Sequence, residues 1–536
     1  MKLNYEGLKD TDAWKAAGIG LPSYDPEALA AHTKQAPRWV HFGIGNIFRV
    51  FIGGIADRLI SSGSMDTGII CAESFDHDIV DIIYRPFCNL VLSVILHRDG
   101  RTDKRVLGPL TEALKAAPQA EEDWTRLREI FSDPGLQMVS FTITEKGYAL
   151  RSLDGSRPGF VGQDLENGPE RPGSAMGIVA ALLYERWKSG GAPIAMVSMD
   201  NLSHNGDKLK ASVLEMAGTW ADKGFVPGEF ISYLTDGSVT FPLTMIDKIT
   251  PRPGEDIVKA LTADGVEDMD ILVTSKKTYI APFANAEGPE YLVVEDNFPN
   301  GRPPLEKAGV YMTDRETVNK SERMKVLVCL NPLHTALCTY DCLLGYKYFA
   351  DGMHDPDLAE LARQVGYKEG LPVVEDPGIL SPQAFIDEVL TERFPNSYLG
   401  DTSQRIAVDI SQMVGIRFGE NIKIYTEREG SAKKLTAIPL AIAGWLRYLL
   451  AVDDNGAPME LAPDPMIPKL REMMSGITFG DPLSLKDQLK PILSDKGLFG
   501  SDLYEAGIGT KIEEMVREQL AGPGAVRKTL HKYLFG

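Results

Sequence analysis

Cysteine and histidine are scarce in this chain: of 536 residues, five are cysteines and eight are histidines. No two cysteines form a CxxC pair, and no two histidines form an HxH or HxxxH pair. The usual spacings of a zinc site are therefore missing, and we predict no metal. The cysteines fall in apolar or strand-like contexts, which is typical of buried thiols in a reducing cytoplasm.

The chain also lacks an excess of basic residues and long apolar runs. Lys and Arg total 56 against 75 Asp and Glu, a formal charge of −19, which argues against a nucleic-acid or anionic-membrane surface. A small anionic substrate needs only one or two local cations and is not excluded. No apolar run approaches the ~20 residues of a membrane-spanning helix, and the N-terminus lacks the apolar core of a signal peptide. We expect a soluble cytoplasmic protein.

The first three hundred residues alternate between short strands and helices. With 43% hydrophobic residues the chain has enough apolar surface for sizeable cores. Residues 1–37 look like a polar lead-in, and a strand is expected at Trp39–Phe42. Further strand and helix patterns follow at 67–76, 91–102, 138–148, 174–191 and 192–206. Such alternation predicts βαβ units and a mostly parallel sheet.

The second half of the chain has a different texture. After a stretch rich in turn residues, 295–309, the periodic segments are helical. They lie at 319–330, 333–350, 356–366, 382–393, 435–451, 465–475 and 510–520. The pattern predicts an α/β domain over 1–315 and a mostly helical domain over 316–536.

A glycine-containing turn, "GIGNIFR", follows the first strand and opens a helix. Two glycines would let the backbone approach a pyrophosphate, and the helix N-terminus supplies N–H groups and a positive dipole. The third glycine of the G-x-G-x-x-G pattern is missing, so an ordinary strand–helix turn is the alternative. The cofactor-binding candidates here are Gly43, Gly45, Asn46, Ile47, Phe48 and Arg49.

An acidic residue ends the next strand. Glu73 lies roughly where a carboxylate should meet the adenosine ribose hydroxyls of a dinucleotide. A carboxylate there would repel a 2′-phosphate, which favours NAD over NADP. Asp76 could play the same part.

Polar segments follow two later strands. "ITEKGY" supplies Thr144, Glu145 and Lys146 as cofactor-binding candidates, and "DNLSHNG" supplies Asn201. Ligands of open α/β sheets bind at the carboxyl ends of the strands, where both segments are expected. The alternative for each is a polar turn, since Asn, Gly and Ser are common in turns.

The segment "MKVLVCLNPLHTAL" carries Lys325, Asn331 and His334 through otherwise apolar sequence. Burying such groups costs several kcal/mol unless they are paired or used. Asn331 and His334 are three apart and share a helix face, although Asn331 before Pro332 also suits a helix N-cap and His334 a satisfied core histidine. Lys325, flanked by apolar residues, should be desolvated, which would lower its pKa towards that of a general base.

These segments resemble the polyol-specific long-chain dehydrogenases, the mannitol dehydrogenase family. "HFGIGNIFR", "TITEKGY", "DNLSHNG", "FPLTMIDKITP", "VVEDNFPNGRPPLEKAGV", "MKVLVCLNPLHTAL" and "LLGY" occur in the family's order, over residues 38–450. The family includes mannitol 2-dehydrogenases and the mannonate and altronate oxidoreductases. The resemblance implies a metal-independent NAD(P)-dependent enzyme with an N-terminal Rossmann-type domain, a largely helical C-terminal domain, and a site between them.

The resemblance also assigns roles to residues. Lys325 matches the catalytic general acid/base, and Asn201 and Asn331 match the asparagines that hydrogen-bond the reacting oxygen. His334 matches a substrate-orienting histidine. The polar residues that line the substrate pocket in the family correspond to Asp247 and Arg405.

Two departures from the family pattern stand out. Lys325 and Asn331 are six positions apart, whereas five is usual in the family. One extra residue would turn the lysine by ~100° off the shared helix face; a π-bulge or a break at Pro332 would absorb it, and Lys320 is the fallback. Met413 stands where mannitol dehydrogenases carry a lysine.

We therefore expect an NAD-dependent enzyme that interconverts D-mannonate and D-fructuronate. Arg405 is the first candidate to meet the substrate carboxylate, and Arg417 is the second. The alternatives are a mannitol or arabinitol 2-dehydrogenase, an altronate (tagaturonate) oxidoreductase and, outside enzymes, a dinucleotide-binding sensor. The expected partner is a small sugar acid or polyol, and no oligomeric state is predicted.

Overall fold

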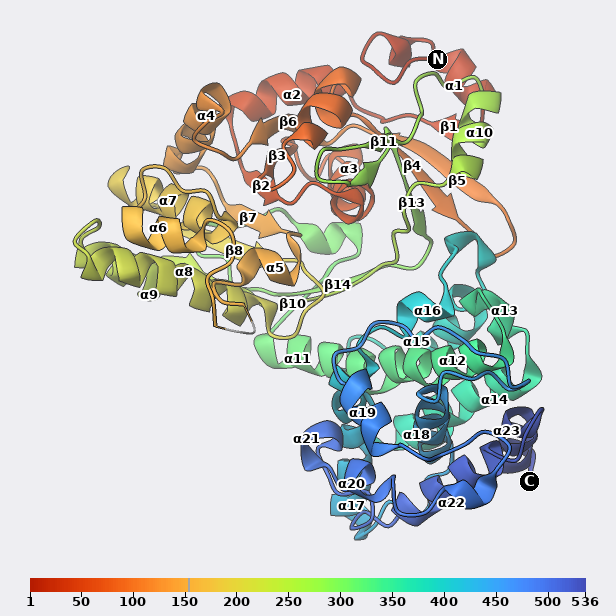
Figure 1. The fold of residues 1–536 in the computed structure, drawn as a ribbon. Helices are drawn as coiled ribbons and strands as arrows, with labels where there is room; N and C mark the ends of the chain where they lie inside the picture. The colour runs from red at the N-terminus through yellow and green to blue at the C-terminus, as the bar shows by residue number, and fades with distance from the viewer. Residues whose placement is uncertain (153–154) are drawn as a thin grey trace. The chain divides into compact units, whose positions relative to one another are not determined.

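The chain forms two compact units in the computed structural model, which describes residues 1–152 and 155–536 (Figure 1). Unit 1 consists of Met1–Leu96 and Arg101–Asn319. Unit 2 consists of Lys320–Gly536 together with the short segment His97–Gly100. The units divide inside helix α11 (Arg315–Met324), whereas the sequence pattern predicted the change at 315–316.

The centre of unit 1 is a six-stranded sheet in which every neighbouring pair is parallel. Its strand order is β6-β3-β2-β7-β8-β9, so the chain builds outwards from β2 in one direction and then from β7 in the other. This is the doubly wound order of dinucleotide-binding folds, with its switch point between β2 and β7. The strands are β2 (Trp39–Phe42), β3 (Ile69–Glu73), β6 (Leu110–Lys115), β7 (Met138–Phe141), β8 (Ile194–Ser198) and β9 (Val239–Thr240).

Helices bury both faces of this sheet. On one face Val40 and Ile70 join an apolar cluster with α4 (Glu121–Ser132), α7 (Ala175–Lys188) and α8 (Asn205–Asp222). On the other face Trp39 and Ile69 join a cluster with α3 (Gly53–Ser61). Neighbouring residues of a strand thus enter opposite cores, which explains why β2 and β3 are buried along their whole length.

The first 37 residues are a folded part of unit 1, which corrects their interpretation as a polar lead-in. They form α1 (Thr11–Ala16), β1 (Ile19–Gly20) and α2 (Pro26–Gln35). Trp14 is completely buried, and β1 pairs with β5 (Thr102–Leu107) in a second sheet of order β1-β5-β4-β13. The other strands of that sheet are β4 (Val91–Leu96) and β13 (Phe283–Glu287). The segment is polar because α2 buries only one narrow stripe.

Two smaller sheets complete unit 1. One has the order β10-β14-β15, from β10 (Thr244–Asp247), β14 (Tyr291–Glu295) and β15 (Tyr311–Thr313). The other pairs β11 (Leu272–Val273) with β12 (Tyr279–Ile280).

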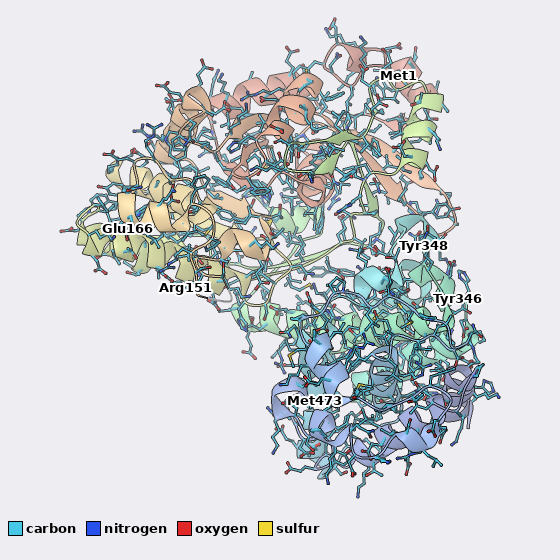
Figure 2. The ribbon with its side chains drawn as sticks, in the orientation of Figure 1. Met1, Arg151, Glu166, Tyr346, Tyr348 and Met473 are labelled. Carbon is cyan, nitrogen blue, oxygen red and sulfur yellow. The ribbon has the colours of Figure 1, made fainter. Side chains whose placement is uncertain are left out.

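Unit 2 is built from helices around α18 (Ala437–Tyr448), whose residues are all buried. Such a helix, buried on all sides, belongs at the centre of a bundle, and α12 and α22 pack against it. Figure 2 shows the side chains of the unit, among them Tyr346, which follows α12 and donates a hydrogen bond to Asp355 (2.8 Å). The main helices are α12 (Asn331–Leu344), α13 (Phe349–Met353), α14 (Pro356–Arg363), α15 (Pro382–Glu388), α17 (Glu420–Glu429), α19 (Ile467–Met473), α22 (Gly509–Gln519) and α23 (Ala525–Phe535).

One helical stretch, Arg315–Leu344, has the length and apolar composition of a membrane span among the residues that the structure describes. Most of its apolar window is buried inside the protein. A buried core helix of a soluble protein has the same composition, so this segment is weak evidence for a membrane protein.

Candidate active site

One edge of the six-stranded sheet gathers the predicted cofactor-binding residues. Because β2, β3, β7 and β8 are parallel neighbours, their carboxyl ends lie at the same edge. The glycine turn follows β2 and Glu73 ends β3. Thr144 and Asn201 come just after β7 and β8. The structure therefore brings these segments together at the switch point where dinucleotides bind.

The two glycines of the turn have different physical roles. Gly43 has a φ of +88°, and a Cβ atom there would lie 2.2 Å from the carbonyl oxygen of Thr142. Only glycine fits this position. A Cβ atom at Gly45 would meet nothing within 4 Å, so the space beside this backbone is open. A buried hydrogen bond stabilises the turn: the hydroxyl of Tyr84 donates to the carbonyl of Ile44 (2.8 Å).

The helix after the turn begins with a π-helix, η2 (Phe48–Ile52), which precedes α3. Phe48 and Arg49 are completely buried, so they support the turn from inside the core. Arg49 Nη1 lies 3.4 Å from Asn46 Oδ1, and burial lowers the pKa of Arg49 to about 10. Asn46 and Ile47 are the partly exposed positions of this segment.

Glu73 is tied into the backbone around it. Its carboxylate accepts N–H groups from Phe75 (2.8 Å), Asp76 (3.1 Å) and Ile44 (3.2 Å). Burial raises the pKa of Glu73, and these three N–H groups act in the opposite direction. The acid thus links the end of β3 to the glycine turn. Asp76 is engaged differently, because Thr274 and Thr278 donate their hydroxyls to it.

Phe75 is a residue that sequence reasoning missed. This side chain is 69% exposed, which is unusual for phenylalanine, and it lies two residues after Glu73. The Nζ atom of Lys276 lies 5.4 Å from its ring centroid. A flat apolar ring beside Glu73, at the end of β3, is well suited to stack on the adenine ring of a dinucleotide. The only signal in the sequence was its nearness to Glu73.

The turn after β7 holds a strained residue. Thr144 has a φ of +64°, which is a rare conformation for a β-branched residue and costs on the order of 1–3 kcal/mol. The carboxylate of Asp200 accepts the N–H groups of Ile143 (2.8 Å) and Thr144 (2.9 Å) and the hydroxyl of Tyr148 (2.6 Å). Charge-assisted bonds of this kind offset the strain. Asp200 therefore fixes the turn; the sequence pattern drew attention to Asn201 beside it.

Asn205 anchors the same loop from its other end. Its Nδ2 donates to the carbonyl of Asp200 (3.0 Å) and to Thr244 Oγ1 (2.8 Å). The polar-turn alternative thus explains part of "DNLSHNG". Asn201 is exposed between these anchors, and Asp247 is buried at the end of β10.

In unit 2, Lys325 begins a π-helix, η6 (Lys325–Cys329). Its side chain is 1% exposed, and its carbonyl accepts the N–H of Leu330 (3.1 Å), which closes the wide turn. Leu330 then leaves helical geometry (φ −132°, ψ −64°), and α12 starts at Asn331. Both accommodations expected for the extra residue, a π-bulge and a break near Pro332, are present. Lys320 lies one turn earlier, in α11.

Asn331 and His334 occupy the first turn of α12. Within the described chain the Asn331 side chain makes no hydrogen bond, so the N-cap alternative has no support. His334 is held by two aromatic rings: its ring centroid lies 4.3 Å from that of Phe394 and 5.1 Å from that of Phe349. This packing leaves the imidazole partly exposed and fixes its direction.

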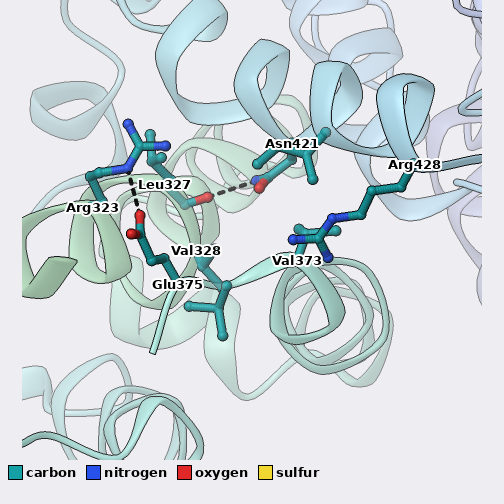
Figure 3. A pocket seen from close by; sticks show the side chains of 9 residues that line it. Arg323, Leu327, Val328, Val373, Glu375, Asn421 and Arg428 are labelled. Carbon is teal, nitrogen blue, oxygen red and sulfur yellow. Dashed lines mark hydrogen bonds and ion pairs between the residues drawn. The ribbon is translucent and has the colours of Figure 1, made fainter. Parts of the chain in front are cut away.

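A pocket of about 390 Å³ flanks the π-helix within unit 2 (Figure 3). Asn421 lines it and donates Nδ2 to the carbonyl of Leu327 (2.7 Å), a group inside the irregular part of the helix. Across the pocket Arg323 pairs with Glu375 (3.1 Å). Lys325, Asn331 and His334 are not among its lining residues. We therefore assign the residues that line this pocket to stabilising the π-helix, and not to the candidate active site.

No group of three or more His, Cys, Asp or Glu that could hold a metal ion occurs in residues 1–152 and 155–536.

Two family models match the chain. The mannitol dehydrogenase Rossmann domain matches residues 37–307, and the mannitol dehydrogenase C-terminal domain matches residues 317–519. The D-mannonate oxidoreductase of Thermotoga maritima is 51% identical over 99% of this chain and 99% of its own length.

Solved structures agree with this comparison. A D-sorbitol dehydrogenase in substrate-free form has a TM-score of 0.76 at 27% identity, covering 95% of this chain and 98% of its own. The mannitol 2-dehydrogenase of Pseudomonas fluorescens, in a ternary complex with NAD and D-mannitol, has a TM-score of 0.72 at 25% identity, covering 100% of both chains.

Proposed function

The chain belongs to the mannitol dehydrogenase family, and from this premise we propose that it is an NAD-dependent oxidoreductase that interconverts D-mannonate and D-fructuronate. The observation that carries the proposal is the 51% identity, over nearly the whole of both chains, with a D-mannonate oxidoreductase. A sugar acid or a polyol is the substrate class of the similar proteins, and the acid is the choice that this relative favours.

The sheet edge of unit 1 fits a dinucleotide. Gly45 leaves its side of the turn open, Gly43 sets the turn, and Asn46 and Ile47 begin the helix whose N–H groups suit a pyrophosphate. Glu73 ends β3, where the ribose hydroxyls are expected. When bound, the nicotinamide supplies the hydride acceptor of the oxidation and the hydride donor of the reduction.

The turn after β7 would contact the nicotinamide half of the cofactor. Thr144, Glu145 and Lys146 begin the short helix α5 (Thr144–Tyr148) at this turn, and Asp200 fixes the start of that helix before any ligand arrives. A turn that is already ordered loses little entropy on binding. We assign these residues to cofactor binding and Asp200 to positioning them.

Lys325 is our general acid/base. In the oxidation its neutral amine takes the proton of the reacting hydroxyl; in the reduction its ammonium returns a proton to the oxygen. We assign Asn331 and Asn201 the amide donors that stabilise negative charge on that oxygen. The unbonded side chain of Asn331 supports this assignment, because a structural asparagine would use its amide within the protein. His334 orients the substrate, and Asp247 contacts its hydroxyls.

A cytoplasmic location suits a soluble enzyme of this kind with free thiols at all five cysteines. The test of the function is the rate of NADH oxidation with fructuronate, tagaturonate and fructose. We expect fructuronate to be reduced with the highest kcat/KM. A preference for tagaturonate would identify an altronate oxidoreductase, and a preference for fructose a mannitol dehydrogenase. NADH binding without turnover of any of the three would favour a sensor.

A further inference from the structure

Arg417 is a cation for which the described residues provide no anionic partner. It lies in the π-helix η12 (Gly415–Gly419), where its Nη1 donates to Thr335 Oγ1 (2.6 Å). No carboxylate pairs with it in the part of the chain that the structure describes. Burial lowers the pKa of Arg417 to about 10, so the guanidinium is still charged at neutral pH. A desolvated charge of this kind is unfavourable unless it is used.

The position of Arg417 connects it to the predicted catalytic residues. Thr335 lies four residues after Asn331 and directly after His334 in α12. Residues three and four apart share one helix face, so Arg417 is attached to the face that carries Asn331 and His334. The π-helix η12 also packs against η6, which carries Lys325.

Arg417 still has donors to offer. Of the guanidinium nitrogens of Arg417, only Nη1 makes a hydrogen bond in the described chain, the one to Thr335. The other two, Nε and Nη2, are not among the completely buried atoms that lack a hydrogen bond, so solvent reaches them. A guanidinium with free N–H groups in a fixed fork matches a carboxylate in bidentate geometry.

Arg405, the first candidate from the sequence, differs from Arg417 because it is exposed and already has an anionic partner. Its side chain is 65% exposed and forms an ion pair with Asp401. A carboxylate ligand would have to compete both with this partner and with water. The comparison favours Arg417.

We propose that Arg417 binds the carboxylate of the sugar-acid substrate and thereby separates sugar acids from neutral polyols. The inference rests on the proposed function for the identity of the acid. It assigns the selectivity to one residue: a neutral substrate leaves the guanidinium without an anion, whereas an aldonate or uronate neutralises it.

The experiment compares kcat/KM for fructuronate and fructose in the wild type and in Arg417→Met, Arg417→Lys and Arg405→Met. Arg363→Met is the matched control, because Arg363 is an exposed arginine with a long ion pair (3.9 Å). We expect Arg417→Met to lower kcat/KM for fructuronate by roughly 10²-fold, mainly through KM. The value for fructose should change less than about threefold. Arg417→Lys should fall between, and Arg405→Met and Arg363→Met should keep most of the preference.

A retained preference in Arg417→Met, or its loss in Arg405→Met alone, would overturn the inference. A calorimetric comparison of the Kd for anionic D-gluconate with the Kd for neutral D-sorbitol separates failure of the Arg417 inference from failure of the proposed function. A wild type that does not reduce fructuronate refutes the function, yet Arg417 is still tested by whether gluconate binding disappears in Arg417→Met. Unfolding midpoints show whether the methionine variant is folded. If it is not, the same gluconate measurement on Arg417→Lys decides: unchanged affinity contradicts bidentate binding.

Discussion

Replacing the glycines of the Gly43–Gly45 turn by alanine, one at a time, should separate the folding role of this turn from its binding role. At Gly43 the left-handed φ costs an alanine roughly 1–2 kcal/mol. Its Cβ would also lie 2.2 Å from a backbone oxygen, which cannot move without disturbing the end of β7. We expect Gly43→Ala to lower the free energy of unfolding by about 3–5 kcal/mol, at the upper end for single substitutions.

Gly45→Ala should behave in the opposite way. Its Cβ meets nothing within 4 Å and its φ is not left-handed, so stability should change by less than about 1 kcal/mol. The added methyl would occupy the space through which a pyrophosphate approaches the backbone. We expect the Kd for NADH to rise about 10–100-fold, which corresponds to about 1.4–2.8 kcal/mol.

Urea unfolding and fluorescence titration with NADH measure the two quantities. Gly218→Ala is the matched control, because a Cβ there also meets nothing within 4 Å and the residue lies inside α8, away from the turn. A Gly45→Ala variant that binds NADH like the wild type would show that the turn does not hold the cofactor. Unchanged stability in Gly43→Ala would refute the geometry of the turn itself.

Three further predictions follow from single side chains. Lys325→Ala should reduce turnover by ~10²–10⁴-fold with nearly normal NADH binding, and stopped-flow and titration test this; an inactive Lys320→Ala beside an active Lys325→Ala would reassign the base. Glu73→Ser should narrow the preference for NADH over NADPH, measured as the ratio of kcat/KM, and a wild type that favours NADPH contradicts the role of the acid. Burial raises the pKa of Asp200, so its stabilising contribution is full below about pH 3.9 and is lost as the pH rises through the raised value. The asparagine of Asp200→Asn cannot ionise. The urea midpoint of unfolding should therefore drop more between pH 4 and pH 7 in the wild type than in this variant.

The sequence predicts well what depends on local patterns. β2 begins and ends where its apolar run meets Arg38 and Gly43, and the burial of Lys325 follows from its apolar neighbours. The helical character of the second half is visible for the same reason, since side chains repeat with the period of a helix. The π-helix at Lys325 was foreseeable because a residue count differed from the family pattern.

What the sequence could not provide depends on residues far apart in the chain. Asp200 holds Thr144 from 56 positions away, and no local signal marks that bond. Likewise, Arg405 and Arg417 look alike as sequence; only the fold gives one of them Asp401 as a partner and leaves the other with a hydroxyl. The sequence also does not reveal that the polar segment 1–37 is folded, because its burial comes from strand pairing and from Trp14, and not from a broad apolar stripe.

The π-helix of Lys325–Cys329 also bears on how this chain should be aligned with others. A one-residue insertion in a regular helix rotates everything beyond it by ~100°, which is why length differences usually collect in loops. Here the wide turn and the kink at Leu330 take up the added residue inside the helical segment. Under the roles proposed above for Lys325 and Asn331, an alignment that keeps this helix free of gaps would pair one of the two with a residue of another role. The gap then belongs between them, where the π-helix and Leu330 accommodate the added residue.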